Sequence, residues 1–399
     1  MMIVGAGKAA ARAVLALREL GWNGAIILIG EEPEPPYDRP PLSKAALTAE
    51  AAPEPVFILD ESMLASLGVT FLAGVAAVGI SPAEKLLSLA DGRHLPYHRL
   101  LLATGARARK LPRAEHSRTL RDLGDSRTLH RELAPGRKVV VIGGGFIGLE
   151  VAASASKRGC SVTVLESQPR ILMRGVCASI ATAVSDRHAA AGVSIVTGAC
   201  IASVAADAVV LQDGQNFAAD IIVAGIGAVP ETALAEAAGL AIDNGIACDA
   251  GLRTSAPDIF AAGDCCSFPH SLYEDRRIRL EAWRAAADQA AVAAENMLGG
   301  NRRFEAVPWF WSDQYELSLQ IAGIPGESAA TSTRQLKDGA FIEFQFDGEH
   351  RLVCASGIGR GNIIARDIRL AEMLIAKRAR PSPAALADAA TGLKSLLAA

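Results

Sequence analysis

Several chemical signatures are missing from this chain of 399 residues, and each absence excludes a class of protein. No apolar stretch reaches the roughly 18–20 residues that a membrane-spanning helix needs. The formal net charge of −3 gives no basic excess for nucleic acid. C-x-x-C and H-E-x-x-H spacings are absent, so we expect no protein-bound metal. Seven cysteines without regular spacing fit a reducing compartment, and we expect a cytoplasmic protein without membrane binding.

Glycine, by contrast, is plentiful at 37 residues, and the most informative glycines lie within residues 138–150. This stretch reads as an apolar strand, a turn with Gly143, Gly145 and Gly148 in G-x-G-x-x-G spacing, and a helix over about 149–158. These glycines permit the tight turn, the approach of a pyrophosphate and close helix packing, in that order. The next strand, Ser161–Glu166, ends in an acid placed to bind an adenosine ribose. The pattern predicts a dinucleotide site.

A shorter copy of this pattern begins the chain. Residues 2–11 predict a strand, a turn with Gly5 and Gly7, and a helix to about residue 20. Ala10 stands at the third glycine position, which the fingerprint tolerates because Ala is small. A strand at 25–29 follows and is again succeeded by acids, Glu31 and Glu32. Two such units imply two nucleotides, and the usual pair is a flavin beside a nicotinamide.

Other segments have a coarser signal. Four prolines stiffen residues 35–44, so a helix is expected to begin only after Leu42; the segment is interpreted as a wall of a flavin pocket, or else as an ordinary surface connection. Residues 48–55 predict an exposed loop. Further strands are expected at Val69–Leu72, Leu86–Leu89, 99–103, 259–262, 309–311, 317–322, Phe341–Phe346 and 351–356, and helices at 281–298, 362–379 and 384–397.

Taken together, the motifs resemble those of the NADH-dependent FAD ferredoxin reductases, which serve aromatic-ring dioxygenases and class I cytochromes P450. The resemblance rests on GAG at 5–7, YDRPPLSK at 37–44, ATGAR at 103–107, GGGFIGLE at 143–150, AGIGAVP at 224–230, TSAPDIFAAGDC at 254–265 and PWFWSDQ at 308–314. It covers nearly the whole chain. Departures are Ala10 for glycine, Glu231 after the proline, where the family often has Asn, and a short first strand.

The resemblance implies an α/β fold with two Rossmann-like dinucleotide-binding domains, as in glutathione reductase, and a small α+β C-terminal domain over the flavin. The FAD domain is expected at 1–111 and 232–303, the NAD domain at 112–231 and the C-terminal domain at 304–399.

The resemblance also implies which residues hold each cofactor. For non-covalent FAD these are Gly5, Gly7, Ala9, Ala10, Glu31, Arg39, Lys44, Ala77, Ala103, Thr104, Gly105, Arg131, Gly263, Asp264, Trp283 and Trp311. Asp264 is expected at the start of a helix, where the dipole favours a carboxylate. For NADH they are Gly143, Gly145, Phe146, Ile147, Gly148, Glu150, Glu166 and Gly227.

Charge chemistry refines three of these expectations. Lys44 and Glu150 are solvated charges by default; near the nicotinamide–flavin contact they would pair, orient the hydride donor and balance the charge of reduced flavin. The acidic Glu166 favours NADH over NADPH, because it would repel a 2′-phosphate and Arg170 lies four residues further on. Trp283, Trp309 and Trp311 are candidates for the flavin pocket, although core packing explains them equally well.

The electron acceptor is inferred from a missing dithiol. Disulfide reductases with this architecture have two redox cysteines before a Pro-Ser-Lys, whereas the first cysteine here is Cys160 and the vicinal pair Cys265-Cys266 lacks C-x-x-C spacing. Reduced flavin must therefore pass its electrons to an external acceptor. A patch of arginines could dock an acidic [2Fe–2S] ferredoxin, or be scattered solvated charges: Arg276, Arg277, Arg279, Arg302, Arg303 and Arg360.

We therefore predict an NADH:ferredoxin oxidoreductase that transfers a hydride to FAD N5 and then single electrons to a [2Fe–2S] ferredoxin. Two alternatives stay open: a reductase of another one-electron acceptor, such as rubredoxin or monodehydroascorbate, and an NADH-sensing interaction protein like apoptosis-inducing factor. The latter proteins have long extra segments and targeting sequences, which this chain is expected to lack.

Overall fold

A computed structural model describes residues 1–326 and 329–397, and the chain divides into two compact units. Unit 1 comprises Met1–Asp38, Pro55–Arg107 and Val229–Ala306. Unit 2 comprises Arg39–Glu54, Ala108–Ala228 and Val307–Ala399. Arg39–Glu54, expected in the FAD domain, therefore packs within unit 2. The three-domain division stays a prediction, and residues 327–328 and 398–399 of its last domain lie outside the described part.

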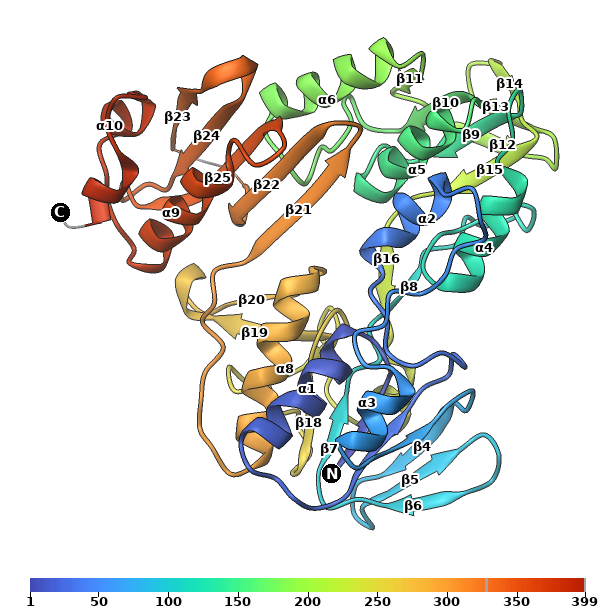
Figure 1. The fold of residues 1–399 in the computed structure, drawn as a ribbon, viewed down its shortest axis with the longest axis vertical. Coiled ribbons are helices and arrows are strands. Elements are labelled where there is room, and N and C mark those ends of the chain that lie inside the picture. Colours follow the sequence, from blue (N-terminus) through green and yellow to red (C-terminus); the bar gives the residue numbers. More distant parts are fainter. Residues whose placement is uncertain (327–328, 398–399) are drawn as a thin grey trace. The chain divides into compact units, whose positions relative to one another are not determined.

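Unit 1 is built on a five-stranded parallel sheet (Figure 1). In spatial order its strands are β18 (Ile259–Ala261), β7 (Leu100–Leu102), β1 (Met2–Val4), β2 (Ile26–Ile29) and β3 (Val69–Leu72). β1, β7 and β18 are buried throughout, because helices cover parallel sheets on both faces. Two of these helices, α1 (Lys8–Glu19) and α8 (Trp283–Met297), pack side by side.

Smaller elements complete unit 1. One antiparallel sheet contains β4 (Ala77–Ser81), β5 (Leu86–Leu89) and β6 (His94–Pro96); another sheet contains β17 (Ile246–Ala247), β19 (Cys266–His270) and β20 (Arg276–Ile278). The short helices are α3 (Glu61–Ser66), α7 (Ala233–Ala237) and the 3₁₀ turn η2 (Ser271–Tyr273). Asp60 accepts a hydrogen bond from the Met63 N–H and so caps α3.

Unit 2 contains a second parallel sheet, with strand order β11-β10-β9-β15. These strands are β11 (Ser194–Thr197), β10 (Ser161–Glu166), β9 (Lys138–Ile142) and β15 (Ile221–Ala224). Accompanying helices are η1 (Pro40–Ser43), α2 (Ala45–Thr48), α4 (Leu123–Glu132), α5 (Phe146–Lys157) and α6 (Ala178–Ala190). An antiparallel sheet follows, with β12 (Ile201–Val204), β13 (Ala208–Leu211) and β14 (Asn216–Ala218). The chain crosses between the units within β8 (Ala106–Ala108) and β16 (Ala228–Pro230).

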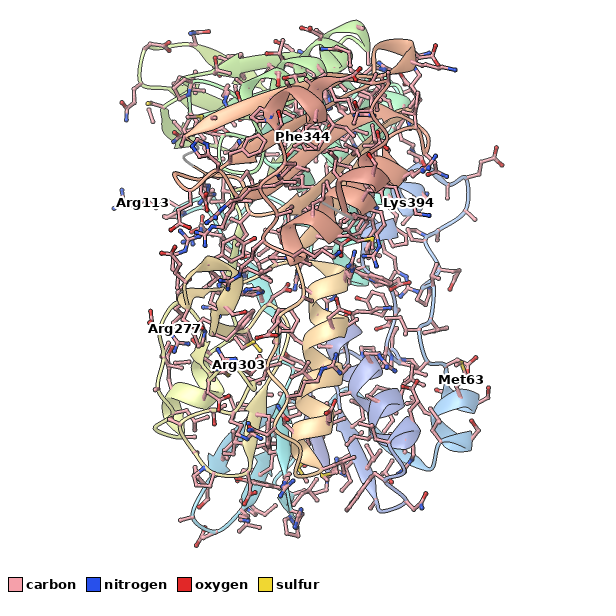
Figure 2. The ribbon with its side chains drawn as sticks, turned by 90° about the vertical axis from the view of Figure 1, so that its left-hand side faces the viewer. Met63, Arg113, Arg277, Arg303, Phe344 and Lys394 are labelled. Atoms are coloured by element: carbon pink, nitrogen blue, oxygen red, sulfur yellow. The ribbon has the colours of Figure 1, made fainter. Side chains whose placement is uncertain are left out.

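The C-terminal part of unit 2 is a five-stranded antiparallel sheet with a helix on it. Its strands, in spatial order, are β21 (Trp309–Gln314), β22 (Leu317–Gly323), β25 (Leu352–Arg360), β24 (Phe341–Phe346) and β23 (Ala330–Gln335). The helices are η3 (Lys337–Gly339), α9 (Ala365–Ala376), α10 (Pro383–Ala387) and η4 (Leu393–Leu397). Phe344, labelled in Figure 2, is fully buried in this sheet's core.

Three local expectations are wrong. A 3₁₀ turn already begins at Pro40, because proline fits the first positions of a helix, where its missing N–H costs nothing. Asp264 lies in a turn between β18 and β19 and starts no helix. Residues 384–397 form two short helical pieces rather than one helix, and Asp388, whose side chain accepts from Ala390 N–H and Thr391 Oγ1, lies where the helix is interrupted.

Across residues 1–326 and 329–397, the helices are all too short or too polar to span a bilayer.

Candidate nucleotide and redox site

The first glycine turn of unit 1 lies between β1 and α1, at the point where the strand order reverses between β1 and β7. Gly5 has a positive φ of +103°, and a Cβ there would collide with the carbonyl oxygen of Ala103. A Cβ at Gly7 would meet no protein atom within 4 Å. Gly7 is also the N-cap of α1, and no side chain in the described residues caps it. The turn thus leaves open space at free N–H groups, which fits a pyrophosphate.

The second glycine turn, in unit 2, repeats this arrangement between β9 and α5. Gly143 also has φ +103°, and a Cβ there would lie 2.5 Å from the carbonyl oxygen of Gly225, which follows β15. Gly145 faces open space apart from that carbonyl at 3.9 Å and caps α5 without a side-chain hydrogen bond among the described residues. A Cβ at Gly148 would collide with the Gly143 carbonyl oxygen, so only glycine fits there. This turn fits a second pyrophosphate.

Glu166 lies against the second turn, as the spacing predicted. One carboxylate oxygen accepts from the Gly144 N–H at 2.7 Å, and the other from the Gln168 N–H at 2.7 Å. Arg170 donates instead to four carbonyl oxygens of its own loop, at Ile171, Leu172, Met173 and Val176. The Glu166 carboxylate therefore lies beside the second glycine turn, whereas the Arg170 side chain is bound to the backbone of its own loop.

Lys44 and Glu150 form an ion pair within unit 2, with 2.9 Å between Nζ and Oε2. The Glu150 side chain is 3% exposed and that of Lys44 is 24% exposed. Ser43 Oγ donates to Glu150 Oε2, and Ser312 Oγ donates to Glu150 Oε1, both at 2.5 Å. A buried carboxylate is stable only when it is paired and hydrogen-bonded, and Glu150 meets both conditions. The predicted pair exists.

The segment that contains Lys44 is hydrogen-bonded to residues of α5 and α4. Ser154 Oγ donates to the Ser43 carbonyl oxygen at 2.7 Å, and Ser126 Oγ donates to that of Leu42 at 3.0 Å. Arg158 follows α5 and donates to the carbonyl oxygens of Leu47 and Ala49. These bonds explain why Arg39–Glu54 packs in unit 2.

The tryptophans have specific polar and aromatic partners. In unit 1, Trp283 Nε1 donates to Asp38 Oδ1 at 2.6 Å, and Lys8 Nζ lies 3.5 Å from the Trp283 ring centroid. In unit 2, Trp309 and Trp311 stack with centroids 5.4 Å apart. They share one face of β21 because side chains alternate along a strand. All three are partly exposed, so none is simply a core residue.

Two further loops in unit 1 contain predicted flavin residues. Gly263, with φ +89°, donates its N–H to the fully buried Gln289 Oε1 at 2.7 Å. Thr104 Oγ1 donates to the Glu231 carbonyl oxygen at 2.8 Å, next to Gly105. Ala103 is buried beside Gly5, and Ala9 and Ala10 are buried in α1. Asp264 lies in the turn after Gly263, Ala77 begins β4, and Glu31 is exposed after β2.

The remaining predicted residues lie in unit 2. The Phe146 ring packs against Phe310 with centroids 4.5 Å apart, so its side chain is used in packing. Ile147 is 46% exposed beside the second turn, and a Cβ at Gly227 would meet open space. Arg39 donates to the Arg121 carbonyl oxygen at 2.9 Å. Arg131 is exposed on α4 with hydrogen bonds to its own helix. The individual assignments of residues to cofactors stay predictions.

The seven cysteines are all free thiols. Burial raises the pKa of Cys265 to about 11. A hydrogen bond with Cys248 and burial hold the pKa of Cys266 well above its usual range. Thiolates are the reactive form of cysteine, so these vicinal thiols are inert at neutral pH.

The arginines of the expected docking patch are largely paired with carboxylates. Arg277 pairs with Asp243 and also donates to two backbone carbonyls. Arg279 pairs with Glu281, Arg302 with Glu295, and Arg303 with Asp275 and Glu305. Figure 2 labels Arg277 and Arg303. This pairing lowers the positive charge available to an acidic partner.

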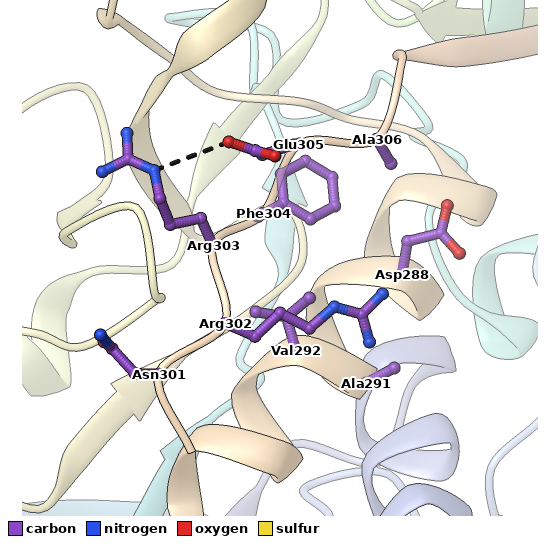
Figure 3. A pocket seen from close by; sticks show the side chains of 9 residues that line it. All are labelled: Asp288, Ala291, Val292, Asn301, Arg302, Arg303, Phe304, Glu305 and Ala306. Atoms are coloured by element: carbon purple, nitrogen blue, oxygen red, sulfur yellow. Dashed lines mark ion pairs between the residues drawn. The ribbon is translucent and has the colours of Figure 1, made fainter. Parts of the chain in front are cut away.

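A cavity of about 630 Å³ lies in unit 1 beside α8 (Figure 3). Its walls contain Arg302 and Arg303 but none of the predicted cofactor residues. The lining residues are Asp288, Ala291, Val292, Asn301, Arg302, Arg303, Phe304, Glu305 and Ala306.

Comparison with known protein families agrees with two nucleotide-binding turns. Residues 1–290 match the family described as pyridine nucleotide-disulphide oxidoreductase, and residues 309–397 match the reductase C-terminal domain. The chain belongs to the pyridine nucleotide-disulphide oxidoreductase family. Members of this family use a flavin and a pyridine nucleotide, which agrees with two nucleotide turns.

Individual relatives of this oxidoreductase are similar over nearly their full lengths. The ferredoxin–NAD(+) reductase component of the anthranilate 1,2-dioxygenase system of Burkholderia cepacia is 39% identical, with 99% of this chain and 98% of the relative covered. Putidaredoxin reductase of Pseudomonas putida is 37% identical, with 100% and 97% covered. The reductase in the crystal structure of a covalent putidaredoxin reductase–putidaredoxin complex is 36% identical, with a TM-score of 0.93 and 100% and 97% covered. The predicted family and fold class are confirmed.

Sequence reasoning missed several residues around the pair and the tryptophans. Ser43 adjoins Lys44 and could have been included by proximity alone. Ser312 follows Trp311 in a strand, so period-2 alternation would have placed it on the opposite face. Asp38 lies in the motif YDRPPLSK, but a single acid among prolines does not indicate a tryptophan partner.

Proposed function

We propose that this oxidoreductase is an FAD-dependent NADH:ferredoxin reductase that serves a cytochrome P450 or a Rieske-type dioxygenase. The observation that carries the proposal is the pair of glycine turns, each with open space at its second glycine, in a chain whose vicinal thiols are inert. Two nucleotides fit, and an internal dithiol acceptor does not. The two reductase relatives above, one from a dioxygenase system, support ferredoxin as the acceptor.

Bound FAD would supply hydride acceptance from NADH and release of single electrons to a [2Fe–2S] partner. The chain's own contribution is alignment and charge. Gly5 and Gly7 would hold the FAD pyrophosphate, and Gly143, Gly145 and Gly148 that of NADH. Lys44, held by Glu150, would orient the hydride donor and balance negative charge on reduced flavin. No protein acid or base is required for the hydride transfer.

We propose that the protein prefers NADH to NADPH because of the charged side chains Glu166 and Arg170. Its carboxylate, held by Gly144 and Gln168, would bind ribose hydroxyls and repel a 2′-phosphate. Arg170 donates to four carbonyl oxygens of its own loop, so these donors are not available to bind a 2′-phosphate. A cytoplasmic location stays a prediction.

The test is NADH-driven cytochrome c reduction with and without a [2Fe–2S] ferredoxin, with rubredoxin and monodehydroascorbate as alternative acceptors. Strong dependence on ferredoxin, with NADPH much weaker, is expected. If NADH bleaches the flavin but no ferredoxin speeds turnover, the acceptor is wrong. A slow reaction with every acceptor and a long-lived reduced flavin–NAD⁺ complex would favour the sensing role.

A further inference from the structure

Behind the Lys44–Glu150 pair, unit 2 contains a chain of buried polar side chains. Gln314 Nε2 lies 3.4 Å from Ser312 Oγ, and His188 Nε2 lies 2.8 Å from Gln314 Oε1. Tyr315 Oη lies 3.4 Å from His188 Nδ1. Ser312 and His188 are 0% exposed and Gln314 is 4% exposed. The chain thus runs from the partly exposed turn between β21 and β22 to the carboxylate of Glu150.

The hydrogen bonds of this chain have one consistent direction. An ionised carboxylate only accepts, so the Ser312 hydroxyl must donate to Glu150. The Ser312 oxygen then accepts from the Gln314 amide, whose carbonyl oxygen accepts from His188 Nε2–H. His188 Nδ1 is left as the acceptor for the Tyr315 hydroxyl. Every donor therefore points toward Glu150, and this direction fixes the tautomer of His188.

The surroundings of His188 keep it neutral. Burial lowers the pKa of His188; the hydrogen bond with Gln314 opposes this shift, and the charge of neighbouring Arg187 adds to it. On the facing hairpin, Tyr315 packs edge-on against His188, and Glu316 pairs with Arg187 at 2.8 Å. The Arg187 guanidinium lies 4.0 Å from the Tyr315 ring centroid and Lys157 Nζ lies 5.7 Å from it. These contacts hold the far end of the chain in place.

Burial of a serine, a glutamine and a histidine costs free energy unless each bond is made, so apolar packing alone does not account for them. We propose that Ser312, Gln314 and His188 are positioning residues that aim the ionised Glu150 carboxylate at Lys44, and so set the rate of hydride transfer from NADH. The inference rests on the proposed function. The three residues act through Glu150, and no bond to them forms or breaks.

The experiment follows anaerobic bleaching of the flavin by saturating NADH in a stopped-flow instrument, at one fixed pH near neutrality. Three variants interrupt the chain: Ser312→Ala, Gln314→Leu and His188→Phe. His188→Gln retains an amide donor near the place of Nε2–H. Ser356→Ala is the matched control, because Ser356 is a buried serine of the same antiparallel sheet whose hydroxyl contacts only Cys354 among the described partners.

Ser312→Ala should slow bleaching about tenfold, since it removes a hydrogen bond to a charge. Gln314→Leu and His188→Phe should slow it a few-fold, and His188→Gln should recover most of the loss. The dissociation constant of NADH should be the same in all variants, and the control Ser356→Ala should bleach as fast as the unaltered protein.

Unchanged bleaching rates with lowered unfolding temperatures would overturn the inference and leave the chain a structural element. Equal losses in His188→Gln and His188→Phe would also overturn it. Gln314→Leu and His188→Phe both break the Gln314–His188 hydrogen bond, each from a different side, so one suffices where the other does not fold. If NADH does not bleach the flavin of the unaltered protein, the proposed function itself fails, before any variant is compared.

Discussion

The two glycine turns begin with the same backbone conformation, but they differ at the third position of the fingerprint, which is Ala10 in unit 1 and Gly148 in unit 2. Gly5 and Gly143 share φ +103° and each lies against a carbonyl of the neighbouring crossover, at Ala103 and Gly225. At the third position, however, unit 1 accommodates a fully buried methyl group at Ala10, whereas unit 2 has no room for one at Gly148. The first glycine of each turn is thus required because the backbone of a neighbouring loop lies against it. The distance between the following helix and its strand can differ between the two units.

The largest effect is expected from Gly148→Ala. The added methyl would collide with the Gly143 carbonyl oxygen, and backbone cannot give way as a side chain can. Overpacking of this kind costs about 1–3 kcal/mol, so we expect a lower unfolding temperature and much weaker NADH binding, measured by calorimetry and titration. Ala10→Gly is the matched change in unit 1 and should cost about 1 kcal/mol from helix propensity and about 0.8 kcal/mol from the lost burial of its methyl group. Equal losses in both variants would remove the distinction between the turns.

Gly7→Ala separates cofactor binding from stability. A methyl group there meets no protein atom within 4 Å, so the apoprotein should unfold at nearly the same temperature. The methyl would occupy the space left for a pyrophosphate, and FAD affinity should fall at least about tenfold. Flavin content after gel filtration and fluorescence titration measure this. Gly5→Ala, strained at φ +103°, should lose both stability and flavin; unaltered flavin affinity in Gly7→Ala would place the pyrophosphate elsewhere.

Glu166→Gln tests the acid beside the second turn. Removal of the negative charge should weaken NADH and improve NADPH, and we expect the ratio of their kcat/KM values to shift about tenfold. Steady-state kinetics with ferricyanide as acceptor measure the ratio without a ferredoxin. Glu31→Gln, at the corresponding place after β2, should leave that ratio unchanged and affect only FAD retention. A shift in Glu31→Gln as large as that in Glu166→Gln would contradict the assignment of the two turns.

The smallest effect is expected at the vicinal cysteines. With its pKa raised to about 11, Cys265 is about one part in a thousand thiolate at pH 8. A thiol reagent should therefore label exposed Cys200 rapidly and leave Cys265 and Cys266 unmodified in the folded protein, as peptide mass mapping can determine. Activity should persist in Cys265→Ser. If Cys266 is labelled and activity is lost, the conclusion that the vicinal thiols take no part in the reaction would be wrong.

Much of this architecture could be predicted from sequence because its signals are local. Strands Val69–Leu72, Ser161–Glu166 and Phe341–Phe346 have the expected bounds, since buried strands are continuous apolar runs and half-buried strands alternate. β23 was missed because five of the six residues of ATSTRQ at 330–335 are polar, and only pairing with β24 makes this segment a strand. Asp264 was placed at the start of a helix by the resemblance, and the local sequence did not correct this, because a turn before a strand and a turn before a helix use the same residue types.

The site was predictable in its cofactor motifs but not in what supports them. Lys44 and Glu150 have 105 residues between them in the sequence, and their pairing was predicted from the expectation that both glycine turns serve one flavin. Ser43, Ser312 and Gln314 lie within the motifs YDRPPLSK and PWFWSDQ, but those motifs gave them no role, and His188 lies in no motif. Their partners come from distant segments, and only folding makes them neighbours. Buried polar networks are specified by tertiary contacts, and a sequence pattern does not contain them.

The packing of Arg39–Glu54 in unit 2 has a consequence for protein engineering. A chimaera that exchanged residues 112–231 alone for those of a relative, to change nucleotide preference, would replace Ser154 and Arg158 but keep their partners, Ser43 and Leu47. It would also separate Glu150 from the Ser312 with which it is bonded. The transplantable module is therefore discontinuous: three stretches of chain must be moved together if the donor's charge pair is to arrive intact.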